Sequence, residues 1–134
     1  MRIAVGIVAG IVVAMLCIFA VEWVGHLLYP PPAGLDINDP ADMARVMAVM
    51  PAAAKAFVLL AWFIGALAGA WTANRIAGRG VAGWVVALLV VAGGLATMVM
   101  IPHPVWMWAG GILLPLLAAW IADCISPKPP AETA

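Results

Sequence analysis

The residues of this sequence that are best placed for chemistry are Glu22 and His26, near the end of a long apolar run. Their spacing puts both side chains on one face of a helix, one turn apart. A carboxyl group inside an apolar segment is costly unless it faces other protein groups, finds a partner or stays protonated. A neighbouring imidazole can exchange protons with it near neutral pH. The pair therefore marks a candidate site for binding or proton exchange.

Two further ionisable residues are expected at the same level of the molecule. Lys55 lies near the start of the second long apolar run, and His103 lies in the short connection MIPHPVW between the third and fourth runs. If successive runs are antiparallel, both side chains reach the end of the molecule where Glu22 and His26 lie. The sequence thus predicts one polar cluster, a candidate binding site made of Glu22, His26, Lys55 and His103.

Three interpretations of this cluster compete. In the first, Glu22 bonds to His26 or pairs with Lys55, and the network fixes the register of the helices. In the second, the cluster is a transport or ion-binding site with Glu22 as its titrating group. In the third, His26 and His103 join Glu22 as ligands of a metal or haem, although their spacing matches no known motif. We favour the first interpretation and expect neither a metal nor a cofactor.

An enzymatic function is not indicated by the remaining polar residues. The metalloprotease spacing HExxH is absent. Ser126 is the only serine and follows the last apolar run, while Thr72 and Thr97 have no evident base beside them. Cys17 and Cys124 show no spacing typical of a metal or redox site. We therefore name no catalytic residues.

Composition identifies the solvent that this chain needs. Of its 134 residues, 67% are hydrophobic and 9% are charged, whereas soluble domains are roughly half apolar and about a quarter charged. A core of this size cannot hide so much apolar surface from water, so the lipid bilayer is the expected partner. The formal net charge of zero gives no indication of a nucleic-acid partner.

Four apolar segments are long enough to cross a bilayer, which takes about 20 residues in a helix. They cover residues 3–28, 52–73, 81–101 and 105–122. The first is too long for a typical signal sequence and lacks a good cleavage site, so we interpret it as a retained helix. The sequence predicts a single all-α domain, a four-helix transmembrane bundle. Trp62 lies midway along its helix and is expected to pack inside the bundle.

Basic residues predict how the helices are oriented, because cytoplasmic connections are enriched in lysine and arginine. If the chain crosses the membrane four times, one side of the membrane receives Arg2, Arg75, Arg79 and Lys128. That side should be the cytoplasm of a bacterium, with the chain in the inner membrane and both termini inside. Arg75 and Asp123 are expected to form an ion pair at this inner boundary.

The long connection between the first two helices should contain a short helix of its own. Asp39 suits the cap, and Pro40 suits the first turn. Four apolar residues then recur at helical spacing on one face, namely Met43, Val46, Met47 and Met50. We predict an amphipathic surface helix at about 40–49 on the periplasmic face. Its methionine face is more simply the apolar side of an interfacial helix than a lid, a soft-metal site or a partner surface.

Stripes of small residues indicate where helices can approach closely in lipid. One stripe on the first helix consists of Gly6, Gly10 and Ala14, and one on the second consists of Ala61, Gly65, Gly69 and Ala73. Such stripes serve contacts within one chain or between chains. The sequence therefore leaves open a homo-oligomer or another membrane protein as partner.

Three segments carry a resemblance to known sequences. VEWVGHLLYPPPAGLD, LLAWFIGALAGAW and MIPHPVWMW resemble signature stretches of a group of small four-helix bacterial inner-membrane proteins that have no assigned function. The resemblance implies an inner-membrane location and contributes no catalytic residues. The sequence-based hypothesis is a non-enzymatic membrane protein, structural or accessory. The alternative is a small transporter or an ion- or proton-binding protein that uses Glu22.

Overall fold

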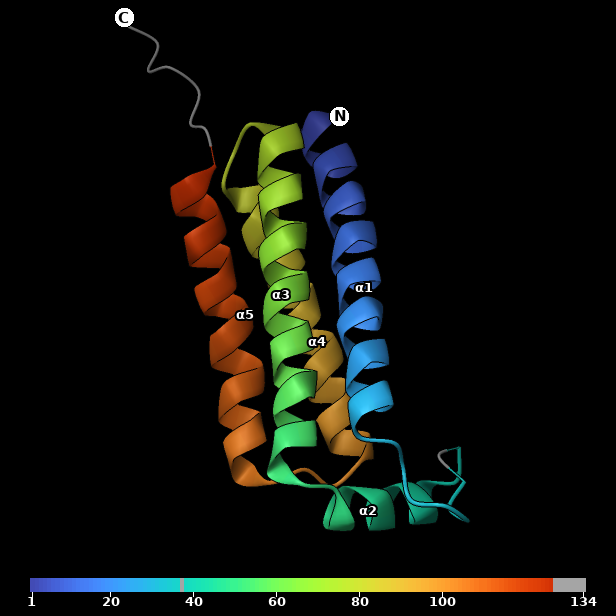
Figure 1. Ribbon diagram of the computed structural model, residues 1–134. Helices are drawn as coiled ribbons and strands as arrows, with labels where there is room; N and C mark the ends of the chain where they lie inside the picture. The colour runs from blue at the N-terminus through green and yellow to red at the C-terminus, as the bar shows by residue number, and fades with distance from the viewer. Residues whose placement is uncertain (37, 127–134) are drawn as a thin grey trace, which may run out of the picture.

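The computed structural model describes residues 1–36 and 38–126, and this part of the chain is helical with no strand. Its five helices are α1 (Arg2–Leu28), α2 (Pro40–Val49), α3 (Ala52–Ala77), α4 (Val81–Met100) and α5 (Val105–Ile125) (Figure 1). All of them except α2 are long and apolar enough to cross a membrane. The predicted all-α bundle of four long helices is confirmed.

Helix bounds follow the local chemistry of the chain. α2 begins at Pro40 because the Asp39 side chain accepts hydrogen bonds from the first free backbone N–H groups of the helix. α3 continues past the predicted end at residue 73 and stops at Ala77, where Gly78 adopts a left-handed conformation with φ of 70°. α5 likewise continues beyond residue 122 to Ile125.

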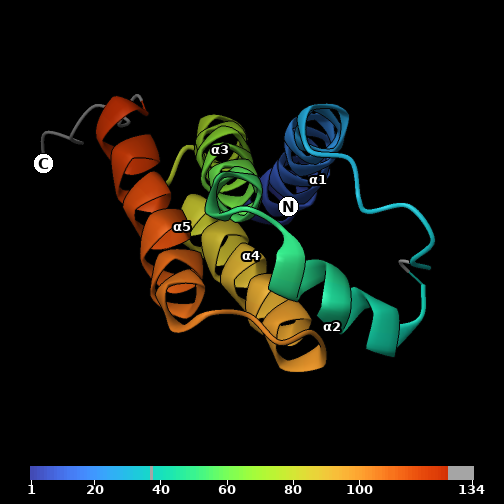
Figure 2. The same ribbon diagram turned by 60° about the horizontal axis from the view of Figure 1, so that its bottom comes forward.

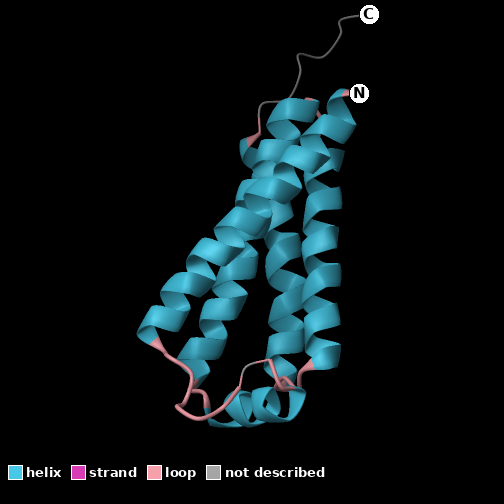
Figure 3. Cartoon of the chain, turned by 90° about the vertical axis from the view of Figure 1, so that its right-hand side faces the viewer, coloured by secondary structure: helices cyan, strands magenta, loops and turns pink. Residues whose placement is uncertain are grey.

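α3 is the central helix, and it packs against α1, α4 and α5 (Figure 1). α1 lies mainly against α3 and makes a smaller contact with α4. The α4–α5 pair leans away from the α1–α3 pair toward the end of the bundle that α2 covers (Figure 3). α2 lies crosswise over this end, on the side away from α5 (Figure 2). We call this end of the bundle the α2 end.

The seam between α1 and α3 is built from the predicted small-residue stripes. A β-carbon on Gly10 would lie 2.6 Å from the carbonyl oxygen of Gly69, and one on Gly69 would lie 2.6 Å from the carbonyl oxygen of Gly10. The same close approach recurs one turn away on each side, where Gly6 faces Ala73 and Gly65 faces Ala14. The backbones approach so closely at these glycines that a larger residue does not fit at the same positions. The stripes therefore serve a contact within one chain.

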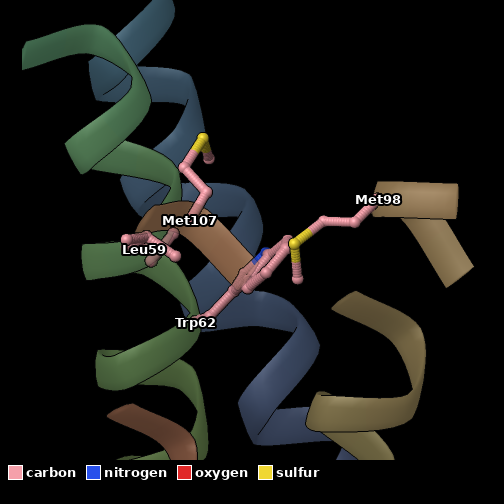
Figure 4. Packing of buried hydrophobic residues seen from close by; sticks show 5 residues of the cluster. Leu59, Trp62, Met98 and Met107 are labelled. Atoms are coloured by element: carbon pink, nitrogen blue, oxygen red, sulfur yellow. The ribbon is translucent and has the colours of Figure 1, made fainter. Parts of the chain in front are cut away.

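Trp62 fills the centre of the bundle between α3, α4 and α5. Its ring packs against Gly94 and Gly111, where an added β-carbon would lie 2.7 and 2.8 Å from the ring. The Met98 side chain extends toward the same ring, and Leu59 and Met107 complete the cluster (Figure 4). The prediction that Trp62 packs inside the bundle is confirmed, and its bulk separates the helices around it.

At the end of the bundle opposite α2, a hydrogen bond joins α3 to α4. The buried Asn74 side chain of α3 accepts a hydrogen bond from the backbone N–H of Gly83 at 2.7 Å, in the first turn of α4. α4 has no cap from its own sequence, so a neighbouring helix supplies one.

The predicted ion pair between Arg75 and Asp123 is wrong. The Arg75 guanidinium instead lies over the ring of Trp71, 5.2 Å from its centre. Asp123 faces Gly80 at the start of α4, where the helix dipole favours a negative charge. Both residues lie at the predicted end of the bundle, but they point toward different neighbours.

Candidate functional site

The four residues of the predicted polar cluster line one cavity of about 250 Å³ at the α2 end. We call this cavity the α2-end chamber. Glu22 and His26 reach it from α1, Lys55 from the first turn of α3, and His103 from the connection between α4 and α5. Separate segments of the sequence thus contribute to one site.

His26 contacts the main chain of Glu22 rather than its carboxylate. The Nδ1 atom of His26 lies 2.8 Å from the backbone carbonyl oxygen of Glu22, and the ring N–H donates to this oxygen. The ring of His103 makes a similar local contact, with Nδ1 2.6 Å from the carbonyl oxygen of Ile101. Both imidazoles are therefore oriented by backbone carbonyl groups, which leaves the second nitrogen of each ring free of that contact.

The carboxylate of Glu22 has no ionic partner in the structure. Within residues 1–36 and 38–126 the one ion pair joins Arg45 to Asp42, at 3.3 Å, and it lies on α2. Glu22 is half-buried. Lys55 lines the same chamber without closing an ion pair with Glu22.

α2 forms the roof of the chamber. Val46 is buried, Met47 packs against the cluster around Trp62, and Met43 and Met50 line the chamber with Met47. The methionine face is therefore turned toward the bundle. Because methionine is flexible and polarizable, it can adapt to contents of different shape.

Acidic residues near α2 are used to fold that helix and its approach. The Asp39 carboxylate accepts the backbone N–H groups of Ala41 and Asp42, at 2.7 and 3.3 Å. The Asp42 carboxylate accepts the backbone N–H of Asp36 at 3.1 Å and pairs with Arg45. These contacts lie within the α2 segment, and they leave Glu22 as the acidic residue that lines the chamber among the described residues.

A second cavity of about 340 Å³ adjoins the chamber and lies nearer the middle of the bundle. It lies between α1 and α4, with Trp62 of α3 at its back, and we call it the α1–α4 groove. Glu22 and Thr97 line both cavities. The other groove residues are apolar, and among the described residues Glu22 is the one ionisable group on its wall. Glu22 therefore lies where a chamber that four ionisable side chains line meets a groove in which Glu22 is the one ionisable group among the described residues.

Sequence reasoning missed the α1–α4 groove. The groove depends on how far α4 leans from α1, which is a property of the packed bundle. One signal was present, because Gly93 and Gly94 are adjacent but meet different surroundings. Gly94 packs against Trp62, whereas a β-carbon on Gly93 would meet no atom within 4 Å. Gly93 lines the groove and leaves it wide.

His26, His103 and Glu22 do not come together as a set of three metal ligands. Among the described residues, no three His, Cys, Asp or Glu side chains come close enough together to hold a metal ion. The alternative in which His26, His103 and Glu22 act as a ligand set therefore has no support from the geometry. The chemistry that the site offers is binding, through one carboxylate, one ammonium group and two imidazoles.

Comparison of the chain with protein families, with curated proteins and with solved structures gives no match. The resemblance to small four-helix inner-membrane proteins therefore stays a prediction from the three sequence segments that carry it. The functional argument consequently depends on the site itself.

Proposed function

We propose that this protein is a small, non-enzymatic membrane protein that binds ions at Glu22, on the wall shared by the α2-end chamber and the α1–α4 groove, with Glu22 as its titrating group. The observation that carries the proposal is the position of Glu22, which lines the chamber with Lys55, His26 and His103 and has no ionic partner among residues 1–36 and 38–126. The proposed location is the bacterial inner membrane, with α2 on the periplasmic face.

The apolar exterior of the bundle supports the membrane location. Large hydrophobic side chains along α1 are more than half exposed, including Leu16, Phe19 and Leu27. Exposure on this scale is stable in lipid and costly in water. Basic residues support the orientation, because Arg2, Arg75 and Arg79 lie at the end opposite α2. Lys128, which the sequence also assigns to this side, lies outside the described residues.

The contacts of Glu22 support ion binding over a purely structural role for the cluster. A network that only fixes helix register would bond the Glu22 carboxylate to His26 or Lys55. The His26 ring bonds instead to a backbone carbonyl, and Lys55 forms no ion pair with Glu22. A carboxylate within an apolar segment is destabilising, by roughly 2.5 to 3.5 kcal/mol at a helix centre and less near the boundary. A bound proton or cation would remove much of that cost.

Infrared difference spectroscopy on the purified protein tests the proposal. Spectra recorded between acidic and alkaline buffers report the carbonyl band of each carboxylic acid that gains a proton. We expect one such band to disappear in Glu22→Gln and to remain in Asp123→Asn, the matched carboxyl-to-amide change at the opposite end. If Glu22→Gln leaves every carboxyl band unchanged, Glu22 exchanges no proton and the proposal fails.

A further inference from the structure

We infer that the cation bound at Glu22 is the ammonium group of an amphipathic molecule whose apolar body occupies the α1–α4 groove. This inference rests on the proposed function and adds the chemical class of the ligand. It depends on one feature of the structure, the position of Glu22 on the wall of an apolar groove that adjoins the chamber.

Charge and polarity of the groove match such a molecule. Its wall is apolar except at Glu22 and Thr97, and the Thr97 hydroxyl already donates to the carbonyl oxygen of Gly93 at 3.0 Å. A molecule complementary to this wall is apolar along its length and positively charged at one end. The groove volume of about 340 Å³ lies in the range of roughly 300 to 1,000 Å³ that is typical of small-molecule sites.

Aromatic rings add to the complementarity for a cation. Phe19 of α1 and Trp62 of α3 both line the groove together with Glu22. Ring faces attract ammonium groups, and this attraction is strongest for groups that bind little water, such as quaternary ammonium ions. An organic cation therefore suits the groove better than a small hydrated metal ion.

The chamber side of Glu22 opposes an approach by cations. Lys55 of α3 lines the chamber, as do His26 of α1 and His103 of the α4–α5 connection. The ammonium group of Lys55 repels a second cation inside this space. The groove side carries no such group among the described residues.

Approach from the groove is consistent with the exposure of its rim. Phe19 is 63% exposed and Leu89 is 49% exposed, and they flank the groove on α1 and α4. In a bilayer this rim meets lipid chains. An amphipathic amine can therefore reach Glu22 directly from the membrane.

Gly93 allows the groove to be filled without disturbing the fold. An added side chain at Gly93 enters open space, whereas one at Gly94 would strike the Trp62 ring at 2.7 Å. Gly93→Leu therefore narrows the groove selectively. Ala92→Leu is the matched control, because Ala92 is the adjacent exposed residue of α4 and does not line the groove.

The experiment measures equilibrium binding to the full chain in nanodiscs of uncharged lipid. The probes are decyltrimethylammonium, tetramethylammonium and decanoate, which separate the cationic head from the apolar body. We expect saturable binding of decyltrimethylammonium, with tetramethylammonium and decanoate at least about tenfold weaker. Glu22→Gln and Gly93→Leu should each weaken decyltrimethylammonium binding by about tenfold or more, the loss expected when one contact in an apolar site is removed. Ala92→Leu and Asp123→Asn should leave it unchanged.

Several outcomes would overturn the inference. Equal binding of decyltrimethylammonium and decanoate would show that Glu22 selects no charge. Equal binding by the wild type and Gly93→Leu would show that the groove holds no apolar body. If no probe binds while the infrared band of Glu22 responds as expected, the inference fails and the proposed ion-binding function stands. If the infrared band is also absent, both fail.

Discussion

The seam between α1 and α3 gives a sharp test of the packing, through the substitution Gly10→Ala. A β-carbon at position 10 would lie 2.6 Å from the Gly69 carbonyl oxygen and 2.9 Å from side-chain atoms of both Ala73 and Val86. Ordinary contacts of this kind begin at 3.4 Å. The carbonyl oxygen belongs to a helix backbone and cannot rotate away, so α1 and α3 must separate.

The expected magnitude is the balance of two effects. Inserting one methyl group into a filled contact costs about 1 to 3 kcal/mol. Replacing glycine by alanine inside a helix returns up to about 1 kcal/mol through helix propensity. With the full offset, we expect Gly10→Ala to lower the free energy of unfolding by up to about 2 kcal/mol. Equilibrium unfolding of the purified protein in detergent, followed by circular dichroism, measures this difference.

Gly93→Ala is the matched control, because the same atom is added to a membrane helix at a position with no atom within 4 Å. It should leave stability unchanged or raise it by up to about 1 kcal/mol. Combining Gly10→Ala with Gly69→Ala should cost less than the two single changes together, since one separation of the helices accommodates both methyl groups. Equal effects of Gly10→Ala and Gly93→Ala would refute the close seam.

Three further changes test other contacts. Asn74→Leu removes the acceptor for the Gly83 N–H and should lower stability by about 1 kcal/mol in the same unfolding assay; an unchanged curve would mean that this contact contributes nothing. Asp39→Ala removes the α2 cap, worth about 1 kcal/mol, so hydrogen exchange should accelerate in residues 40–49 and stay unchanged in α3. Glu22→Gln keeps the side-chain shape and removes an unpaired buried charge, so the melting temperature should stay the same or rise; a marked fall would instead indicate a structural network.

The sequence predicts the elements well because their causes are local. Hydropathy over about 20 residues locates each long helix, and the Asp39–Pro40 pair sets the start of α2. Glycine and alanine at every fourth position predict the seam because only small residues allow that approach. The ends of α3 and α5 extend beyond their predicted bounds, since polar residues such as Asn74 and Asp123 continue a helix until other signals end it.

Features that depend on three helices at once could not be predicted. The α1–α4 groove exists because α4 and α5 lean away from α1 and α3 around the bulk of Trp62. The contact of Asp123 with Gly80 depends on the rotation of α5 about its axis, which spacing along the chain does not fix. The contact of Arg75 with Trp71 is local, because the two residues are four apart on α3. The grouping of Glu22 with Lys55 and His103 follows from antiparallel order, but the position of Glu22 on the walls of both the chamber and the groove does not.

Cysteine labelling in spheroplasts tests the central claim most directly, namely that the long helices cross the membrane and place the chamber on the periplasmic side. In a background where Cys17 and Cys124 are replaced by alanine, one cysteine is placed at Ala33, before α2, and another at Arg79, between α3 and α4. A membrane-impermeant maleimide should label position 33 in intact spheroplasts and position 79 only after lysis. Labelling of both positions in intact spheroplasts, or of position 79 alone, would contradict the account.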